Sequence, residues 1–135
     1  MKYKILSHTA DLRLEVYGKT IEELFTNAAE ALADILVGKE KPLSSMRAVT
    51  EKLQIQSADL NLLLVDFLNE VLAKSQINKR MYKVESLKLI RNELTAEISG
   101  ISVEKFEEDV KAVTYHEVDI KKEGDSYTTK LVLDI

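Results

Sequence analysis

Apolar and polar residues alternate with a period of two near the start of the chain and again after residue 80. Leu12, Leu14 and Val16 alternate with polar or aromatic residues until Gly18, which is typical of a half-buried strand. The preceding segment, Tyr3–Ser7, reads as a short strand. Further strands are predicted over Val49–Gln56, on either side of a turn at Asn92-Glu93, over Lys111–Ile120, and over Tyr127–Asp134 after a turn at Glu123–Asp125.

Two other segments show helical spacing. The first begins after Thr20, which forms a capping box with Glu23, and ends near Gly38. Its apolar stripe comprises Ile21, Leu24, Phe25, Ala28, Ala29, Leu32, Ile35 and Leu36. The second is expected to be capped by Ser57. Its stripe comprises Leu60, Leu63, Leu64, Phe67, Leu68, Val71 and Leu72. Lys39–Arg47, which contains the single proline, is predicted to be a loop.

The order of these elements predicts the fold class. Segregated helices and hairpin-linked strands favour an α+β fold, expected here as a two-layer sandwich. Its sheet would be mainly antiparallel, with both helices packed on one face. The length of 135 residues fits one domain over 1–135. The pattern leaves the order of the strands in the sheet open.

Composition narrows the possible functions. The chain has no cysteine, which excludes disulfides, thiolate zinc sites and thiol nucleophiles. With a net charge of −4, the overall electrostatics do not favour binding to nucleic acid, so an RNA-related role favours a protein partner. No apolar run is long enough to span a membrane, and Lys2 and Lys4 are not followed by a signal-peptide core. We therefore expect no membrane partner, and the lack of cysteine suits a reducing cytosol.

The candidate chemistry begins with acids at the two ends of the chain. Asp11 closes the run His8-Thr9-Ala10-Asp11, and Asp134 precedes the last residue, Ile135. If the first and last strands are neighbours, Asp11, Asp134 and the carboxylate of Ile135 form an oxygen-rich cluster suited to a hard cation. The alternatives are a hydrogen-bonded turn at Asp11 and a solvated rim position for Asp134.

A second run, Lys111-Ala112-Val113-Thr114-Tyr115-His116, holds the only other histidine. Alternation would place Lys111 on one face of a strand and His116 on the other. The alternative is an ordinary strand of mixed polarity, in which Glu117 and Asp119 pair with Lys111.

Together these motifs resemble the archease family. The resemblance rests on His8–Asp11, on Glu22-Glu23-Leu24-Phe25 after Gly18, on Lys111–His116, on the helix with Phe67-Leu68-Asn69-Glu70, and on Leu133-Asp134-Ile135. It runs from one end of the chain to the other. The segment Gly100–Asp109 departs most from the family pattern.

The resemblance implies a small, non-catalytic cytoplasmic protein that activates an RtcB-type RNA ligase in tRNA splicing and RNA repair. Such proteins promote guanylylation of the ligase and multiple turnover, and they meet RNA only through the ligase. They also bind a divalent ion, typically Ca²⁺, with Mg²⁺ or Mn²⁺ as alternatives. Carried over by motif, the metal ligands are Asp11, Asp134 and Ile135, and Lys111 is the functional lysine. His8 and His116 are motif members expected to face the partner.

Two other functions stay open at this point. A metal-dependent hydrolase would use the same cluster with His8 or His116 as general base. A general chaperone-like or methyltransferase-modulating module would act through its surface and not use the acids. The sequence contains no nucleotide or phosphate motif, which favours the activator over the hydrolase.

Overall fold

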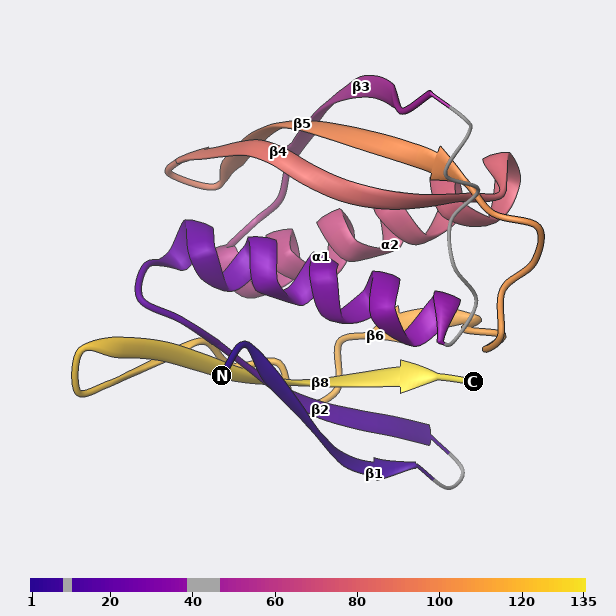
Figure 1. Ribbon diagram of the computed structural model, residues 1–135. Helices are drawn as coiled ribbons and strands as arrows, with labels where there is room; N and C mark the ends of the chain where they lie inside the picture. The colour runs from indigo at the N-terminus through magenta and orange to yellow at the C-terminus, as the bar shows by residue number, and fades with distance from the viewer. Residues whose placement is uncertain (9–10, 39–46) are drawn as a thin grey trace.

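The two helices of the protein lie between two antiparallel sheets, as the computed structural model in Figure 1 shows. The structure describes residues 1–8, 11–38 and 47–135. The predicted α+β class is confirmed. The layers differ from the expected sandwich, because the strands divide into two sheets and each helix packs against both of them. The helices are therefore covered on two sides.

The first sheet carries the candidate acids. Its order is β1-β2-β8-β6, and a short strand, β7, also pairs with β8. The bounds are Tyr3–His8 for β1, Asp11–Gly18 for β2, Ala112–Thr114 for β6, Lys121–Glu123 for β7 and Ser126–Asp134 for β8. Leu12, Leu14 and Val16 are fully buried against the helices, as their alternation predicts. The last strand is therefore central in this sheet, with a neighbour on each side.

Helix α1, Ile21–Val37, follows β2 through a tight connection. Thr20 caps the helix by accepting a hydrogen bond from the Glu23 backbone N–H at 3.0 Å, as predicted. Gly18 is needed at this connection because a Cβ there would lie 2.3 Å from the Leu24 backbone nitrogen. The predicted loop Lys39–Arg47 falls almost wholly outside the described residues.

Helix α2, Leu60–Asn78, is capped by Asp59 and not by Ser57. The Asp59 carboxylate accepts from the Leu62 backbone N–H at 2.9 Å. Both residue types are good caps, so the sequence does not choose between them. The Ser57 hydroxyl instead donates to Asp66 at 2.6 Å.

The second sheet has the order β3-β5-β4, with bounds Val49–Gln56, Glu93–Ser102 and Arg80–Ile90, respectively. The β4–β5 turn is Arg91-Asn92, one residue earlier than predicted, and Arg91 has a φ of 57°. The predicted strand Lys111–Ile120 is also wrong in extent, since only Ala112–Thr114 is extended and paired. No helix within the described ranges is long and apolar enough to cross a membrane.

Candidate functional site

The register of the first sheet brings the two end aspartates together. Strand β8 pairs antiparallel with β2, and Asp11 lies opposite Asp134 at the end of the ladder. The predicted meeting of the two ends of the chain is therefore confirmed, with the second strand rather than the first as the neighbour of the last. Cross-strand partners project to the same face of a sheet, so the two carboxylates share one face. Asp11 is half-buried and Asp134 is exposed.

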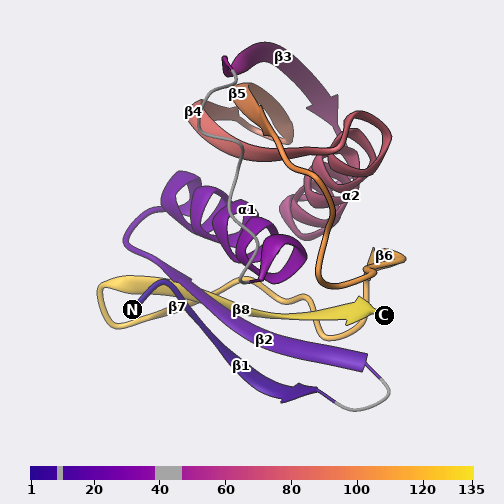
Figure 2. The same cartoon turned by 45° about the vertical axis from the view of Figure 1, so that its right-hand side comes forward.

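Lys111 reaches Asp134 from the other side of β8. Its backbone N–H donates to the Asp134 carbonyl at 2.7 Å, and the next residue, Ala112, pairs with Asp134 in the β6–β8 ladder. Figure 2 shows β6 beside the C-terminal end of β8. Ile135 is half-buried and packs against the hydrophobic core. Four of the six predicted site residues, Asp11, Lys111, Asp134 and Ile135, thus meet at one end of the sheet.

The Arg13 guanidinium attracts Asp11 electrostatically, but its hydrogen bonds go to Glu117. No lysine or arginine in the described part of the chain forms an ion pair with Asp11 or Asp134. Like charges placed directly opposite each other destabilise a strand pair. A bound cation would remove this repulsion.

The donor set fits a hard cation only in part. Carboxylate oxygens are the ligands that Ca²⁺ and Mg²⁺ prefer. Among the described residues, however, no group of three or more His, Cys, Asp or Glu side chains is close enough to hold a metal ion. Two opposed carboxylates are present, and a third protein oxygen would have to come from something other than such a side chain. The terminal carboxylate proposed from the sequence is a donor of this kind.

The two histidines are not brought into this group by any described contact. His116 is exposed beyond the end of β6, where its backbone N–H donates to the Thr114 hydroxyl at 3.3 Å. The β6–β8 register runs from Ala112 opposite Asp134 to Thr114 opposite Val132, so the chain leads away from Asp134 toward His116. The backbone of His8 pairs with Leu12 in β1. The His8 side chain, together with Thr9 and Ala10, lies outside what the structure describes.

The residues after His116 form partnerships that the sequence did not indicate. Glu117 accepts two hydrogen bonds from the Arg13 guanidinium, one of them from Nε at 2.8 Å, and does not pair with Lys111. These bonds lower the pKa of the Glu117 carboxyl. Asp119 pairs with Lys121 at 3.4 Å. Glu117 has a φ of 64°, so the extended strand expected here is interrupted. The alternation of β2 places Arg13 on the face of the strand opposite Leu12 and Leu14, but only the structure shows that Glu117 is its partner.

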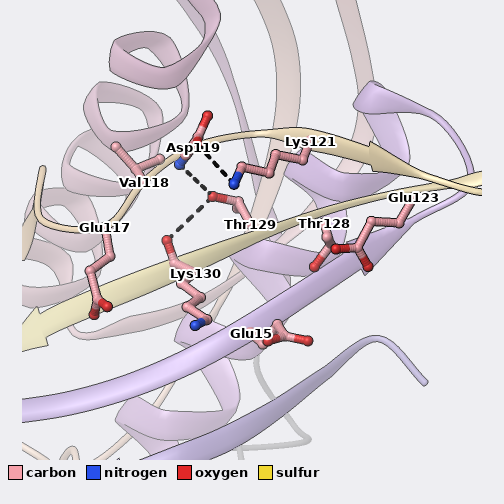
Figure 3. A pocket seen from close by; sticks show the side chains of 9 residues that line it. All are labelled: Glu15, Glu117, Val118, Asp119, Lys121, Glu123, Thr128, Thr129 and Lys130. Carbon is pink, nitrogen blue, oxygen red and sulfur yellow. Dashed lines mark hydrogen bonds and ion pairs between the residues drawn. The ribbon is translucent and has the colours of Figure 1, made fainter.

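A pocket of about 440 Å³ opens beside these ion pairs (Figure 3). Its lining residues are Glu15, Glu117, Val118, Asp119, Lys121, Glu123, Thr128, Thr129 and Lys130. Acids and lysines are mixed along the wall, and the Thr129 hydroxyl accepts from the Asp119 backbone N–H at 2.9 Å. Neither Asp11 nor Asp134 lines it. The pocket is therefore separate from the aspartate pair, and two of its charged lining residues, Asp119 and Lys121, pair with each other.

A contrasting acid lies in the second sheet. Glu51 on β3 accepts hydrogen bonds from the Tyr82 hydroxyl and from Lys74 at 3.1 Å, and Arg80 lies 3.8 Å away. The hydrogen bond from Tyr82 is the main cause that lowers the pKa of the Glu51 carboxyl, and Lys74 adds to it. This acid is surrounded by donors, whereas Asp11 faces another acid.

Comparison with known proteins agrees with the architecture. The family model of the Archease protein family (MTH1598/TM1083) matches residues 3–135. The chain belongs to the archease family. It is 34% identical to the protein archease of Methanosarcina barkeri, an alignment that covers 99% of this chain and 96% of that protein. It is 32% identical to the protein archease of Pyrococcus abyssi, with 99% of each chain covered.

Solved archease-family structures share the fold. The solution structure of Methanobacterium thermoautotrophicum protein 1598 matches with a TM-score of 0.72 and 26% identity over 98% of both chains. The crystal structure of a Thermotoga maritima archease, described as a possible chaperone, gives a TM-score of 0.66 and 25% identity. That match covers 98% of this chain and 96% of the Thermotoga chain. Three layers built from two sheets and two helices are thus a family architecture.

Proposed function

We propose that the chain is a non-catalytic activator of an RtcB-type RNA ligase, acting in tRNA splicing and RNA repair through a divalent-cation site. The observation that carries the proposal is the direct opposition of Asp11 and Asp134 across β2 and β8. Two carboxylates placed opposite each other repel and so cost stability in a structural protein. A bound cation would offset this repulsion. Groups of a partner enzyme would then fill the remaining coordination positions of the cation.

The chain's own residues divide the work as follows. Asp11 and Asp134 hold the cation on one face of the sheet, and the carboxylate of Ile135 is the proposed third donor. When bound, the cation supplies positive charge that neutralises these carboxylates and leaves coordination positions for water or for the partner. Lys111 is exposed, and its backbone N–H bonds the Asp134 carbonyl, so its side chain is proposed to contact the ligase from this end of the sheet. His8 and His116 are proposed to contact the ligase.

A ligase guanylylation assay tests this directly. We expect ligase, GTP and divalent metal to give more guanylylated ligase when the wild-type chain is added. Asp11→Ala and Asp134→Ala should abolish the stimulation while remaining folded, because each removes one of the two opposed donors. Asp125→Ala is the matched control, since it removes an exposed carboxylate from the β7–β8 turn. Normal stimulation by a folded Asp134→Ala variant would refute the proposal.

A second experiment addresses the terminal carboxylate. Adding a few residues after Ile135 moves the carboxylate away while Asp11 and Asp134 stay in register. We expect weaker Ca²⁺ binding and weaker ligase stimulation from the extended chain. Unchanged affinity would remove Ile135 from the ligand set without affecting the two aspartates.

The chaperone-like alternative has one supporting observation, the description of the Thermotoga relative as a possible chaperone. Such a module would act on clients without the aspartate pair. Suppression of client aggregation that is equal for the wild type and for Asp11→Ala, without ligase stimulation by either, favours this function. Hydrolysis of phosphate esters by the purified chain with metal would favour the hydrolase instead.

A further inference from the structure

One side of α2 is hydrogen-bonded to the chain segment 110–120, which includes β6. Four polar side chains of the helix take part. Asn61 accepts from the Ile120 N–H, and Asp66 accepts from the Tyr115 hydroxyl. Asn69 bonds the backbone of Val113, and Gln76 donates to the Val110 carbonyl. Three of these side chains engage the backbone of the segment, through four hydrogen bonds. The helix therefore fixes the conformation of a segment that has little regular secondary structure of its own.

Asn69 makes the most complete of these contacts. Its Oδ1 accepts from the Val113 N–H at 2.9 Å, and its Nδ2 donates to the Val113 carbonyl at 2.8 Å. Val113 is 2% exposed, so both of its backbone groups need partners within the protein. A side-chain amide carries the same donor and acceptor as a peptide unit. On the edge of β6 that faces α2, Asn69 thus takes the place of a neighbouring strand.

This contact lies close to the candidate site. Strand β6 has only three residues, Ala112–Thr114, and pairs with β8 along its other edge. Ala112 lies opposite Asp134, and the Lys111 N–H bonds the Asp134 carbonyl at 2.7 Å. A strand this short has few bonds of its own to hold it, and a strand end frays unless it is tied down. Fixing Val113 therefore also fixes Lys111 against Asp134.

We infer that Asn69 is a positioning residue, whose amide, by replacing a strand beside Val113, holds Lys111 and β6 against Asp134. It touches neither aspartate and acts through the β6 backbone. The link to activation rests on the proposed function, whereas the ordering of Lys111 does not.

Hydrogen exchange of the Lys111 and Val113 amides tests the inference. Asn69→Leu keeps the volume of the side chain but removes both bonds, which leaves two buried backbone groups unpaired. We expect the exchange protection of both amides to fall about 10- to 100-fold. If Asn69→Leu does not fold, Asn69→Ala gives the same test with room for water. Wild-type protection of Lys111 in a folded Asn69 variant overturns the inference.

Asn61→Leu is the matched control, because it makes the same replacement on the same helix and removes one bond to the Ile120 N–H. Ile120 lies toward the far end of the segment, away from Asp134. We expect this control to leave Lys111 protection within about twofold of the wild type. An equal loss of Lys111 protection in both variants would show a general loosening of the segment and overturn a specific role for Asn69.

Measurements of Ca²⁺ affinity and ligase stimulation distinguish a positioning role of Asn69 from a contribution to stability alone. At a temperature where every variant is fully folded, Asn69→Leu should raise both the Ca²⁺ Kd and the chain concentration needed for half-maximal stimulation, while Asn61→Leu changes neither. A purely structural role predicts unchanged values for both variants. If the wild-type chain does not stimulate the ligase, the proposed function fails, and Lys111 exchange still decides the role of Asn69.

Discussion

Glu51 and the Asp11–Asp134 pair are both acids placed by antiparallel strands, yet their surroundings are opposite. Glu51 receives hydrogen bonds from Tyr82 and Lys74, with Arg80 nearby. Asp11 faces Asp134, and no lysine or arginine of the described chain forms an ion pair with either. The first arrangement stabilises the ionised acid, and the second places two carboxylates opposite each other. Glu51 is thus explained by the fold, whereas for the aspartate pair we propose a bound cation as the explanation.

Removing Glu51 should change the stability of the isolated chain more than removing the carboxylate of Asp134 or of Glu123. Glu51→Ala leaves two hydrogen-bond donors, Tyr82 and Lys74, without their acceptor and removes the carboxylate near Arg80. We expect a loss of about 1–3 kcal/mol in the free energy of unfolding, measured by urea denaturation at neutral pH. Glu123→Ala in β7 removes an exposed carboxylate and should change stability by no more than about 0.5 kcal/mol. Equal stabilities for the two variants would remove the structural role of Glu51.

The pH dependence of stability also tests the structural role of Glu51. The folded state lowers the pKa of Glu51 below its ordinary value of 4.5, chiefly through the Tyr82 hydroxyl. A depressed carboxyl pKa contributes stability that is fully present above the unfolded pKa and is lost as the pH falls through the folded pKa. The stability gap between the wild type and Glu51→Gln should therefore be constant near neutrality and shrink below pH 4.5. A gap that widens on acidification contradicts this assignment.

Removing a charge from the aspartate pair should stabilise the chain, by less than the loss of Glu51 destabilises it. In the presence of a chelator, Asp134→Asn removes one of two facing charges and should raise the free energy of unfolding by about 0.2–1 kcal/mol. Asp125→Asn in the exposed turn is the control for a loss of negative charge in general. A clear destabilisation by Asp134→Asn under these conditions would mean that Asp134 has a structural partner.

Much of the fold could be predicted from local pattern. The alternation of Leu12, Leu14 and Val16 identified a half-buried strand, and the Thr20–Glu23 spacing identified the start of α1, because each signal depends on nearby residues alone. The division into two sheets could not be predicted, since it depends on which strands pair at long range. The run Lys111–Ile120 looked like one strand because alternation cannot show that Glu117 adopts a positive φ to meet Arg13.

The candidate site was predictable to a similar degree. Asp11, Asp134 and Lys111 could be selected as chemical candidates from their motifs, and only the register of β8 between β2 and β6 shows that they are neighbours. Asn69 could not be given its role from the sequence, because an amide on the polar side of a helix usually contacts solvent. Its function depends on a strand edge contributed by residues 44 positions later.

The most direct test of the central claim is the effect of Ca²⁺ on thermal unfolding of the wild type and of the double variant Asp11→Asn, Asp134→Asn. Samples with a chelator and matched NaCl control for simple screening of the two charges. A cation that binds only the folded wild type at one hundred times its Kd should stabilise it by about 2.7 kcal/mol and raise its Tm by several degrees. The double variant should show no Ca²⁺-dependent shift. An equal Ca²⁺-dependent rise in both proteins, or none in the wild type, would contradict the assignment of a cation site to the opposed aspartates.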